Sequence, residues 1–204
     1  MPRKLMTAVL VVAALAVAYH FFRDRSATRI GPLNGEAIIC FGDSLTYGTG
    51  APADKSYPAR LEQLLGRPVI NRGVPGDTTA GALARLQKDV LDRSPRIVLI
   101  TIGGNDLRRG VAVRTAQTNL EAILLAIRRQ GALAVVGGID IPLLDRGYGR
   151  MYEEATERTG AVLVKNILAG ILGHDALMSD QIHPNAAGYA IMAQRFHSAI
   201  EPYL

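Results

Sequence analysis

The serine at position 44 lies where nucleophilic chemistry is favoured. Ser44 follows the apolar run Ile38–Phe41 and the pair Gly42-Asp43, so it falls at a predicted turn from a strand into a helix. Such a turn exposes a hydroxyl and places the backbone N–H groups of a helix start beside it, where they can stabilise an oxyanion. A serine hydroxyl needs a base to become nucleophilic, so a partner should come from elsewhere in the chain.

A histidine close to the C-terminus is the best candidate for that base. Asp180 precedes His183 by three positions, so in a turn its carboxylate can accept the imidazole N–H, fix the tautomer and stabilise the imidazolium. Pro184 disfavours a helix at His183, which leaves the segment a loop, and Asn185 is a favoured N-cap for a last helix. Ser44, Asp180 and His183 are therefore predicted to form a catalytic triad.

These residues can meet only if the fold brings distant segments together. Apolar runs bounded by turn residues predict five strands, at Ala37–Phe41, Pro68–Asn71, Arg96–Ile102, Ala132–Ile139 and Ala161–Val164. Helical periodicity predicts helices over 78–92 and 114–130, and a last helix from Asn185. This alternation predicts an α/β fold, a flavodoxin-like three-layer α/β/α arrangement with a five-stranded parallel sheet.

Ligands of such open sheets bind beyond the carboxyl ends of the strands. The segments that follow the predicted strands carry glycines, a serine, an asparagine, carboxylates and a histidine. They are Gly42-Asp43-Ser44, residues 71–77, Gly103-Gly104-Asn105-Asp106, Asp140 and residues 179–185. The fold prediction therefore places these polar groups along one rim of the sheet.

Other chemistries fit parts of the same rim. A metal-dependent phosphohydrolase would hold Mg²⁺ between carboxylates such as Asp43, Asp77, Asp106 and Asp180. A catalytically inactive binding domain of the same fold is a further alternative. A nucleotide-binding module is disfavoured, because Gly42–Gly50 contains no Gly-Lys-Ser/Thr.

Four segments together resemble the GDSL/SGNH hydrolases, and the closest subgroup is that of the small bacterial arylesterases and thioesterase I-like lysophospholipases. The blocks are Gly42–Gly48 with the sequence GDSLTYG, Gly73–Thr79, Gly103–Asp106 and Asp180–Asn185. They occur in the family's order across residues 37–204. The resemblance implies the SGNH hydrolase fold and a serine esterase or thioesterase that needs no metal or cofactor.

The resemblance also implies the roles of single residues. Ser44 would be the nucleophile, with Asp180 and His183 as the other triad members. The oxyanion would be held by the backbone N–H groups of Ser44 and Gly76 and by the side-chain amide of Asn105. Gly76 is chosen because Gly-Asp-Thr is the best-matching part of its block. The expected substrate is a small-molecule acyl ester or thioester.

Composition narrows the range of partners. The chain has 204 residues, of which 49% are hydrophobic and 20% are charged, values typical of a globular protein. The net charge is +5, but the basic residues are spread along the chain without a run of five or more like charges, so we expect no nucleic-acid partner. Cys40 is the single cysteine, which excludes an intramolecular disulfide.

The N-terminus carries a membrane-targeting signal. Residues 5–18 are apolar apart from one threonine, and Ala16-Val17-Ala18 fits a signal-peptide cleavage site. Counted through Phe22, the stretch is long enough for a membrane anchor. Arg23, Arg25 and Arg29 argue against export by the positive-inside rule.

We nevertheless expect export to the periplasm or cell envelope, with residues 5–22 as an inner-membrane anchor and a membrane contact if they are retained. The predicted organisation is a signal peptide or anchor at 1–22, a linker at 23–36 and an SGNH hydrolase domain at 37–204.

Loops 46–56, 107–113 and 140–150 are expected to form the walls of the substrate site. Apolar side chains in two of them suggest an acyl-binding surface, although core or lid packing would explain them as well. They are Leu107, Ile141, Leu143 and Leu144. Arg108 and Arg109 either meet an anionic headgroup or form a solvated surface, and the sequence favours the second.

Overall fold

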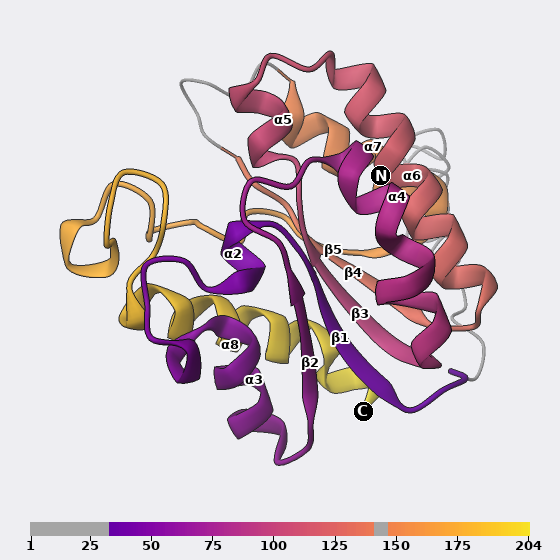
Figure 1. Cartoon of the computed structure of the whole chain (residues 1–204), viewed down its shortest axis with the longest axis horizontal. Helices are drawn as coiled ribbons and strands as arrows, with labels where there is room; N and C mark the ends of the chain where they lie inside the picture. The colour runs from indigo at the N-terminus through magenta and orange to yellow at the C-terminus, as the bar shows by residue number, and fades with distance from the viewer. Residues whose placement is uncertain (1–32, 141–146) are drawn as a thin grey trace, which may run out of the picture. The chain divides into compact units, whose positions relative to one another are not determined.

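The computed structural model describes residues 33–140 and 147–204 (Figure 1). The predicted signal peptide or anchor at 1–22, most of the predicted linker, and Ile141, Leu143 and Leu144 lie outside the described residues. Residues 33–36 have no regular secondary structure, but the Asn34 amide donates to the Gly131 carbonyl at 3.0 Å. This part of the predicted linker is therefore hydrogen-bonded to the domain.

The sheet is parallel throughout, with the strand order β2-β1-β3-β4-β5. Its strands are β1 (Ala37–Gly42), β2 (Val69–Gly73), β3 (Pro95–Thr101), β4 (Leu133–Gly137) and β5 (Val162–Val164). This is the flavodoxin-like order, so the predicted fold class is confirmed. The predicted strand at 132–139 ends earlier, at Gly137, and beyond it the Gly138 carbonyl accepts the Ile167 amide at 2.8 Å.

Helices cover both faces of this sheet, which gives three layers (Figure 1). On one face lie α3 (Tyr57–Leu65) and α8 (Ala186–Ile200). On the other lie α4 (Thr79–Asp89), α6 (Val113–Arg129) and α7 (Tyr148–Thr159). Two short helices, α2 (Ser44–Tyr47) and α5 (Gly104–Arg108), follow β1 and β3 directly. Short 3-10 turns occur at Ala53–Lys55, Leu91–Arg93, Asp175–Leu177 and Glu201–Tyr203.

Local sequence explains where these helices begin and end. The predicted helix over 78–92 is shorter than expected: Thr78 is its N-cap, and after Val90 the chain forms a 3-10 turn. Asn185 caps α8 as predicted, since its side chain accepts the amides of Ala187 and Gly188. The apolar stripe of α6 is fully buried, at Ala116, Leu120, Ile123, Leu124 and Ile127.

The core lies around the central strands. Residues 97–100 of β3 are fully buried, since helices cover both faces of the sheet, and Tyr57 and Phe196 pack with ring centroids 5.1 Å apart between α3 and α8. Such packing gives β1 and β3 a rigid frame. The segments that follow these two strands are α2 and α5, which are thus fixed side by side at the carboxyl edge of the sheet.

Candidate active site

Ser44 is the first residue of α2, at the carboxyl end of β1. The N-cap of this helix is Asp43, whose carboxylate accepts the Leu45 amide at 3.0 Å, so the Ser44 hydroxyl is not used as a cap. A Cβ atom at Gly42 would lie 1.9 Å from the Thr101 carbonyl oxygen. The turn that presents Ser44 therefore requires glycine at position 42, because β3 passes too close for any side chain.

Three side chains form a continuous hydrogen-bonded line at this edge. The Nε2 atom of His183 lies 3.0 Å from Oγ of Ser44, and its Nδ1 lies 2.7 Å from Oδ2 of Asp180. The other carboxylate oxygen of Asp180 accepts the backbone amides of Ile182 and His183, both at 2.8 Å. The structure thus brings the three predicted triad residues into hydrogen-bonding contact.

The carboxylate of this line is held in its ionised form. The hydrogen bond from His183, followed by that from the Ile182 amide, lowers the pKa of Asp180 to about 2. Asp180 is half-exposed, whereas the His183 ring is 15% exposed. Near neutral pH an ionised Asp180 accepts a hydrogen bond from the Nδ1–H group of His183, which leaves Nε2 to accept the Ser44 hydroxyl proton.

The loop that carries His183 is fixed by its own hydrogen bonds. The Ser179 amide donates to the His183 carbonyl at 2.9 Å. The Asn185 side chain donates to the carbonyls of Ala176 and Met178 while it caps α8. The position of His183 is therefore set by a closed loop docked on the start of α8.

Asn105 lies on α5, beside the turn that carries Ser44. Its side chain is 9% exposed, and Nδ2 donates to the Asp77 carbonyl at 2.9 Å. The next residue, Asp106, is buried and accepts both the amide and the hydroxyl of Thr79. These bonds tie α5 to the start of α4 and fix the direction of the Asn105 amide.

Gly76 lies in the loop between β2 and α4. It has a φ of +80°, a conformation that favours glycine, and its carbonyl accepts a hydrogen bond from Arg109 at 2.8 Å. The Asp77 amide donates back to the Val74 carbonyl at 3.1 Å. Gly76 is not among the residues that line the cavity beside Ser44, although Asn105 contacts the adjacent Asp77.

A single arginine anchors this loop to the end of β1. Arg85 binds the Asp77 carboxylate at 2.8 Å and donates to the carbonyls of Gly42 at 2.8 Å and Arg72 at 3.0 Å. Its guanidinium also lies 4.3 Å from the centre of the Phe41 ring. The sequence did not single out Arg85, since a basic residue on a helix usually faces solvent.

Asp43 is the buried acid of the site. Desolvation raises its pKa to about 7, and the nearby charges of Asp77 and Asp106 act in the same direction, against the hydrogen bond from Leu45. Asp43 lies directly before the nucleophile, so its charge affects the field in which Ser44 reacts.

The rim carboxylates do not converge in the way a metal site requires. Asp77 is paired with an arginine, Asp106 with a threonine, and Asp180 with His183. Within residues 33–140 and 147–204, no three His, Cys, Asp or Glu side chains come together as metal ligands. The phosphohydrolase alternative is therefore not favoured by the geometry.

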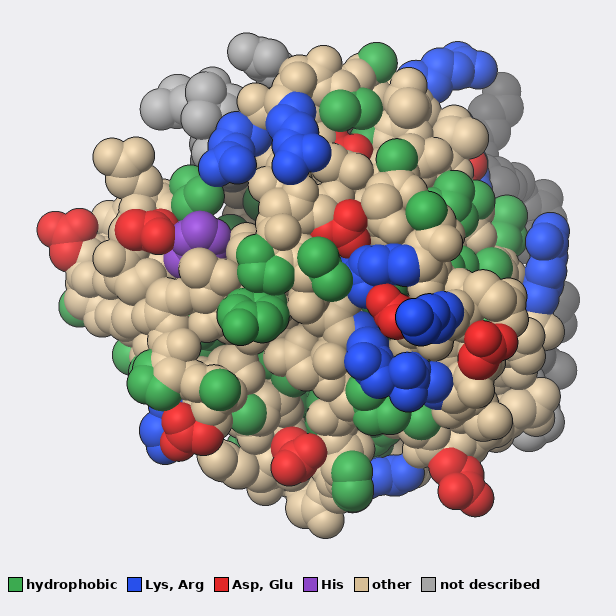
Figure 2. All heavy atoms as spheres, viewed as in Figure 1, with side chains coloured by type: hydrophobic (Ala, Val, Ile, Leu, Met, Phe, Trp, Pro, Cys, Tyr) green, Lys and Arg blue, Asp and Glu red, His purple; other side chains and the backbone are tan. Residues whose placement is uncertain are grey.

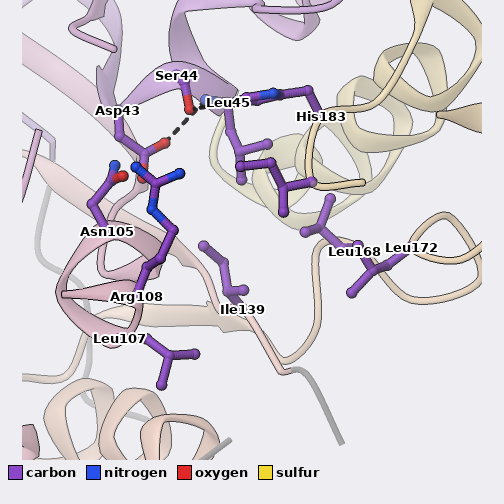
Figure 3. A pocket seen from close by; sticks show the side chains of 12 residues that line it. Asp43, Ser44, Leu45, Asn105, Leu107, Arg108, Ile139, Leu168, Leu172 and His183 are labelled. Carbon is purple, nitrogen blue, oxygen red and sulfur yellow. Dashed lines mark hydrogen bonds between the residues drawn. The ribbon is translucent and has the colours of Figure 1, made fainter. Parts of the chain in front are cut away.

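A cavity of about 330 Å³ opens beside Ser44 (Figure 3). His183 and Ser44 lie at one edge, with Leu168 and Leu172 on one side and Arg108 on the other. The lining is mostly apolar and comprises Asp43, Ser44, Leu45, Gly104, Asn105, Leu107, Arg108, Ile139, Leu168, Leu172, Ile182 and His183. A small apolar cavity with a few polar groups at one edge is typical of a site for a small ligand.

The cavity walls differ in part from those expected. Leu107 lines the cavity as predicted, and Ile139 lies just before the predicted loop 140–150. No residue of the predicted loop 46–56 contributes, because that segment runs into α3, away from the opening. Leu168 and Leu172, which follow β5, were not predicted, although their spacing of four places both on one face of a turn.

The predicted membrane span cannot be placed in the structure, since residues 5–22 are outside the described part. Among residues 33–140 and 147–204, no helix is long and apolar enough to cross a bilayer.

Comparisons with known proteins match this chain to esterases and related acylhydrolases. Residues 40–191 match the GDSL-like lipase/acylhydrolase family. Esterase TesA of Pseudomonas aeruginosa is 32% identical over 183 residues, which cover 83% of this chain and 90% of that protein. Thioesterase 1/protease 1/lysophospholipase L1 of Escherichia coli K12 is 28% identical over 178 residues, which cover 82% of this chain and 84% of that protein. A crystal structure of TesA matches with a TM-score of 0.79 and 29% sequence identity, and the match covers 83% of this chain and 100% of the TesA chain.

Proposed function

Because this chain belongs to the GDSL-like lipase/acylhydrolase family and is a serine hydrolase that acts on carboxylic esters, we propose that Ser44 is its nucleophile, His183 its general base and Asp180 the residue that orients His183. The observation that carries the proposal is the contact of 3.0 Å between Nε2 of His183 and Oγ of Ser44. A nucleophile and base within hydrogen-bond reach, with a third group orienting the base, are what covalent hydrolysis requires.

Acyl transfer proceeds in two halves. Oγ of Ser44 forms a bond to the acyl carbon while its proton passes to Nε2 of His183. The bond to the leaving oxygen or sulfur then breaks, and that atom takes the proton from His183. Water repeats the sequence on the acyl-Ser44 ester and releases the acid. The negative charge that Asp180 retains stabilises the imidazolium formed in each half.

The charge that develops on the acyl oxygen needs donors beside Ser44. We propose the backbone N–H groups of Ser44 and Gly76 and the side chain of Asn105 for this role. The positions of these groups support the proposal. Ser44 is the first residue of α2, and Asn105 lines the cavity. The loop that contains Gly76 is held by hydrogen bonds from Arg109 and Arg85. Donors fixed before the reaction stabilise an oxyanion without reorganisation.

The mostly apolar cavity favours an ester or thioester with a hydrocarbon acyl chain. Leu107, Ile139, Leu168 and Leu172 would contact the chain, while the reacting carbonyl lies at Ser44. Burial of the chain supplies binding energy of about 0.8 kcal/mol for each methylene removed from water. The apolar lining of the cavity is compatible with arylesterase, thioesterase and lysophospholipase activity.

The direct test is the variant Ser44→Ala, with the exposed Ser198→Ala as its matched control. We expect Ser44→Ala to lose hydrolysis of p-nitrophenyl esters and labelling by a fluorophosphonate, while Ser198→Ala keeps both. Activity of the unmodified protein should persist in EDTA. Full activity of Ser44→Ala would overturn the assignment, and loss of activity in EDTA would favour the metal-dependent alternative.

We propose that the segment before the domain directs export to the periplasm or cell envelope. The support is the apolar stretch at residues 5–18 and the cleavage-site pattern at Ala16-Val17-Ala18. In this organisation residues 1–22 form a signal peptide or anchor, 23–36 a linker and 37–204 the hydrolase domain. Sequencing the mature N-terminus tests it: a start at Tyr19 indicates cleavage, whereas retained residues 1–18 indicate an anchor that contacts the membrane.

A further inference from the structure

Two adjacent arginines at the end of α5 have different surroundings. Arg109 donates to the Gly76 carbonyl at 2.8 Å and so belongs to the scaffold of the site. Arg108 instead lines the cavity beside Ser44. Within the part of the chain that the structure describes, no hydrogen bond or ion pair involves the Arg108 side chain. The cavity is thus bordered by a cation that has no partner among the residues that the structure describes.

The other groups that border the cavity do not neutralise this cation. Leu168 and Leu172 lie across the cavity from Arg108, and Ile182 also lines the cavity. Among the described lining residues, Asp43 carries the one carboxylate; it is buried and accepts a hydrogen bond from the Leu45 amide. No ion pair joins Asp43 to Arg108 within the described residues, so the positive charge of Arg108 faces the cavity uncompensated.

Arg108 is exposed to solvent, and its side chain also lines the cavity that holds Ser44. Figure 3 shows Arg108 and Asn105 on the same side of the cavity, with His183 on the opposite side. Basic side chains also gather on this face of the molecule (Figure 2). Apolar walls beside a charge lower the local dielectric constant and strengthen its attraction for an opposite charge.

We propose that Arg108 selects ester or thioester substrates that carry an anionic group, a carboxylate or phosphate, in the acyl chain or in the leaving group. The inference rests on the proposed function and adds to it the charge of the substrate. A guanidinium suits this role, because its planar donors bind carboxylate or phosphate oxygens in pairs. An anion at Arg108 and an acyl carbonyl at Ser44 would fix the substrate at two points of the cavity.

Two matched pairs of substrates test the proposal and locate the anionic group. The first pair is p-nitrophenyl hexanoate and the mono-p-nitrophenyl ester of adipic acid, which differ by a carboxylate at the end of the acyl chain. The second is hexanoyl-4′-phosphopantetheine and the neutral hexanoyl-pantetheine, which differ by one phosphate in the leaving group. For each pair, kcat/KM is measured for the unmodified protein, Arg108→Gln, Arg108→Lys and the control Arg129→Gln. Arg129 is exposed at the end of α6 and does not line the cavity, so its variant makes the same change in net charge.

We expect Arg108→Gln to lower kcat/KM for the anionic member of at least one pair by about 10-fold or more, the size of a charge-assisted hydrogen bond. The neutral member should change less than about twofold, because its binding is hydrophobic. Arg108→Lys should restore part of the loss, and Arg129→Gln should behave like the unmodified protein. The pair that responds shows whether the anion belongs to the acyl chain or to the leaving group.

An unchanged preference between anionic and neutral substrates in both pairs for Arg108→Gln would overturn the inference. An equal effect of Arg129→Gln would overturn it as well, since net charge would then explain the result. Failure of the proposed function gives a different outcome, because the unmodified protein would hydrolyse none of the four compounds, the neutral ones included.

Discussion

Nε2 of His183 lies 3.0 Å from Oγ of Ser44, although 139 positions separate the two residues in the chain. Ser44 reaches this point from the end of β1, and His183 from the loop that precedes α8. Both elements are fixed independently, Ser44 by the Asp43 cap and His183 by the loop around Asn185. The contact therefore depends on the packing of α8 against the sheet.

Asn105→Ala should impair catalysis while it preserves the fold. Loss of one oxyanion donor lowers turnover by about 10²–10³. The lost bond to the Asp77 carbonyl should cost only about 1 kcal/mol of unfolding free energy. Measurement of kcat and of urea unfolding separates the two effects. Asn119→Ala, which removes a bond to Thr79 away from the cavity, is the control and should keep its kcat. A kcat of Asn105→Ala within twofold of the parent would exclude the donor role.

Asp180→Asn should reduce kcat by about 10³–10⁴, the effect of imposing the wrong histidine tautomer. The asparagine oxygen can still accept the amides of Ile182 and His183, so the loop should keep its form. Its NH₂ group, however, faces Nδ1 of His183 and favours a proton on Nε2, which then cannot accept one from Ser44. Unfolding should be nearly unchanged because Asp180 is half-exposed. Retention of more than a tenth of the activity would contradict this role.

Arg85→Lys should destabilise the protein by about 2–4 kcal/mol, because a mostly buried ion pair with Asp77 and two bonds to backbone carbonyls are lost together. Arg158→Lys is the matched control: Arg158 is exposed, so its pairs with Glu121 and Glu154 should be worth less than about 1 kcal/mol. Urea denaturation of both variants gives the comparison. Equal losses would show that Arg85 does not anchor the loop of Gly76.

Asp43 should make stability depend on pH. Its pKa is raised from 3.8 to about 7 in the folded protein, so between these values the folded state binds more protons than the unfolded state. Its contribution to stability is therefore complete below pH 3.8 and is lost as the pH rises to about 7. Asp43→Asn keeps a capping oxygen for the Leu45 amide but cannot ionise.

The unfolding free energy of Asp43→Asn should thus rise relative to that of the parent protein between about pH 4 and pH 8. Urea unfolding at pH 5 and pH 8 measures this difference. A difference that stays constant with pH would show that Asp43 ionises freely in the folded state.

Leu172→Phe should shift the preferred acyl length. A larger side chain in the cavity leaves less room, so kcat/KM for p-nitrophenyl octanoate should fall by about 10-fold relative to the butanoate, the size of one or two lost methylene contacts. Leu64→Phe, at an exposed position on α3, should leave the ratio unchanged. An unchanged ratio in Leu172→Phe would place the acyl chain elsewhere.

Much of the fold follows from local sequence. Apolar runs and helical periodicity predicted the five parallel strands and the helices that the structure shows as α4, α6 and α8, because burial imposes a fixed period on each element. The family prediction is confirmed over residues 40–191. It could be made from the sequence because each motif of the family is a short continuous segment, and the motifs occur in a fixed order. Secondary structure and short motifs depend mainly on residues that are close together in the sequence.

Tertiary structure decided what each polar side chain contacts. Asp43, not Ser44, caps α2, and of two neighbouring arginines Arg109 holds a backbone carbonyl while Arg108 faces the cavity. Leu168 and Leu172 became walls of the site although they follow the last strand of the sheet. Such contacts depend on the direction of side chains and on elements packed from distant parts of the chain, which local patterns do not encode.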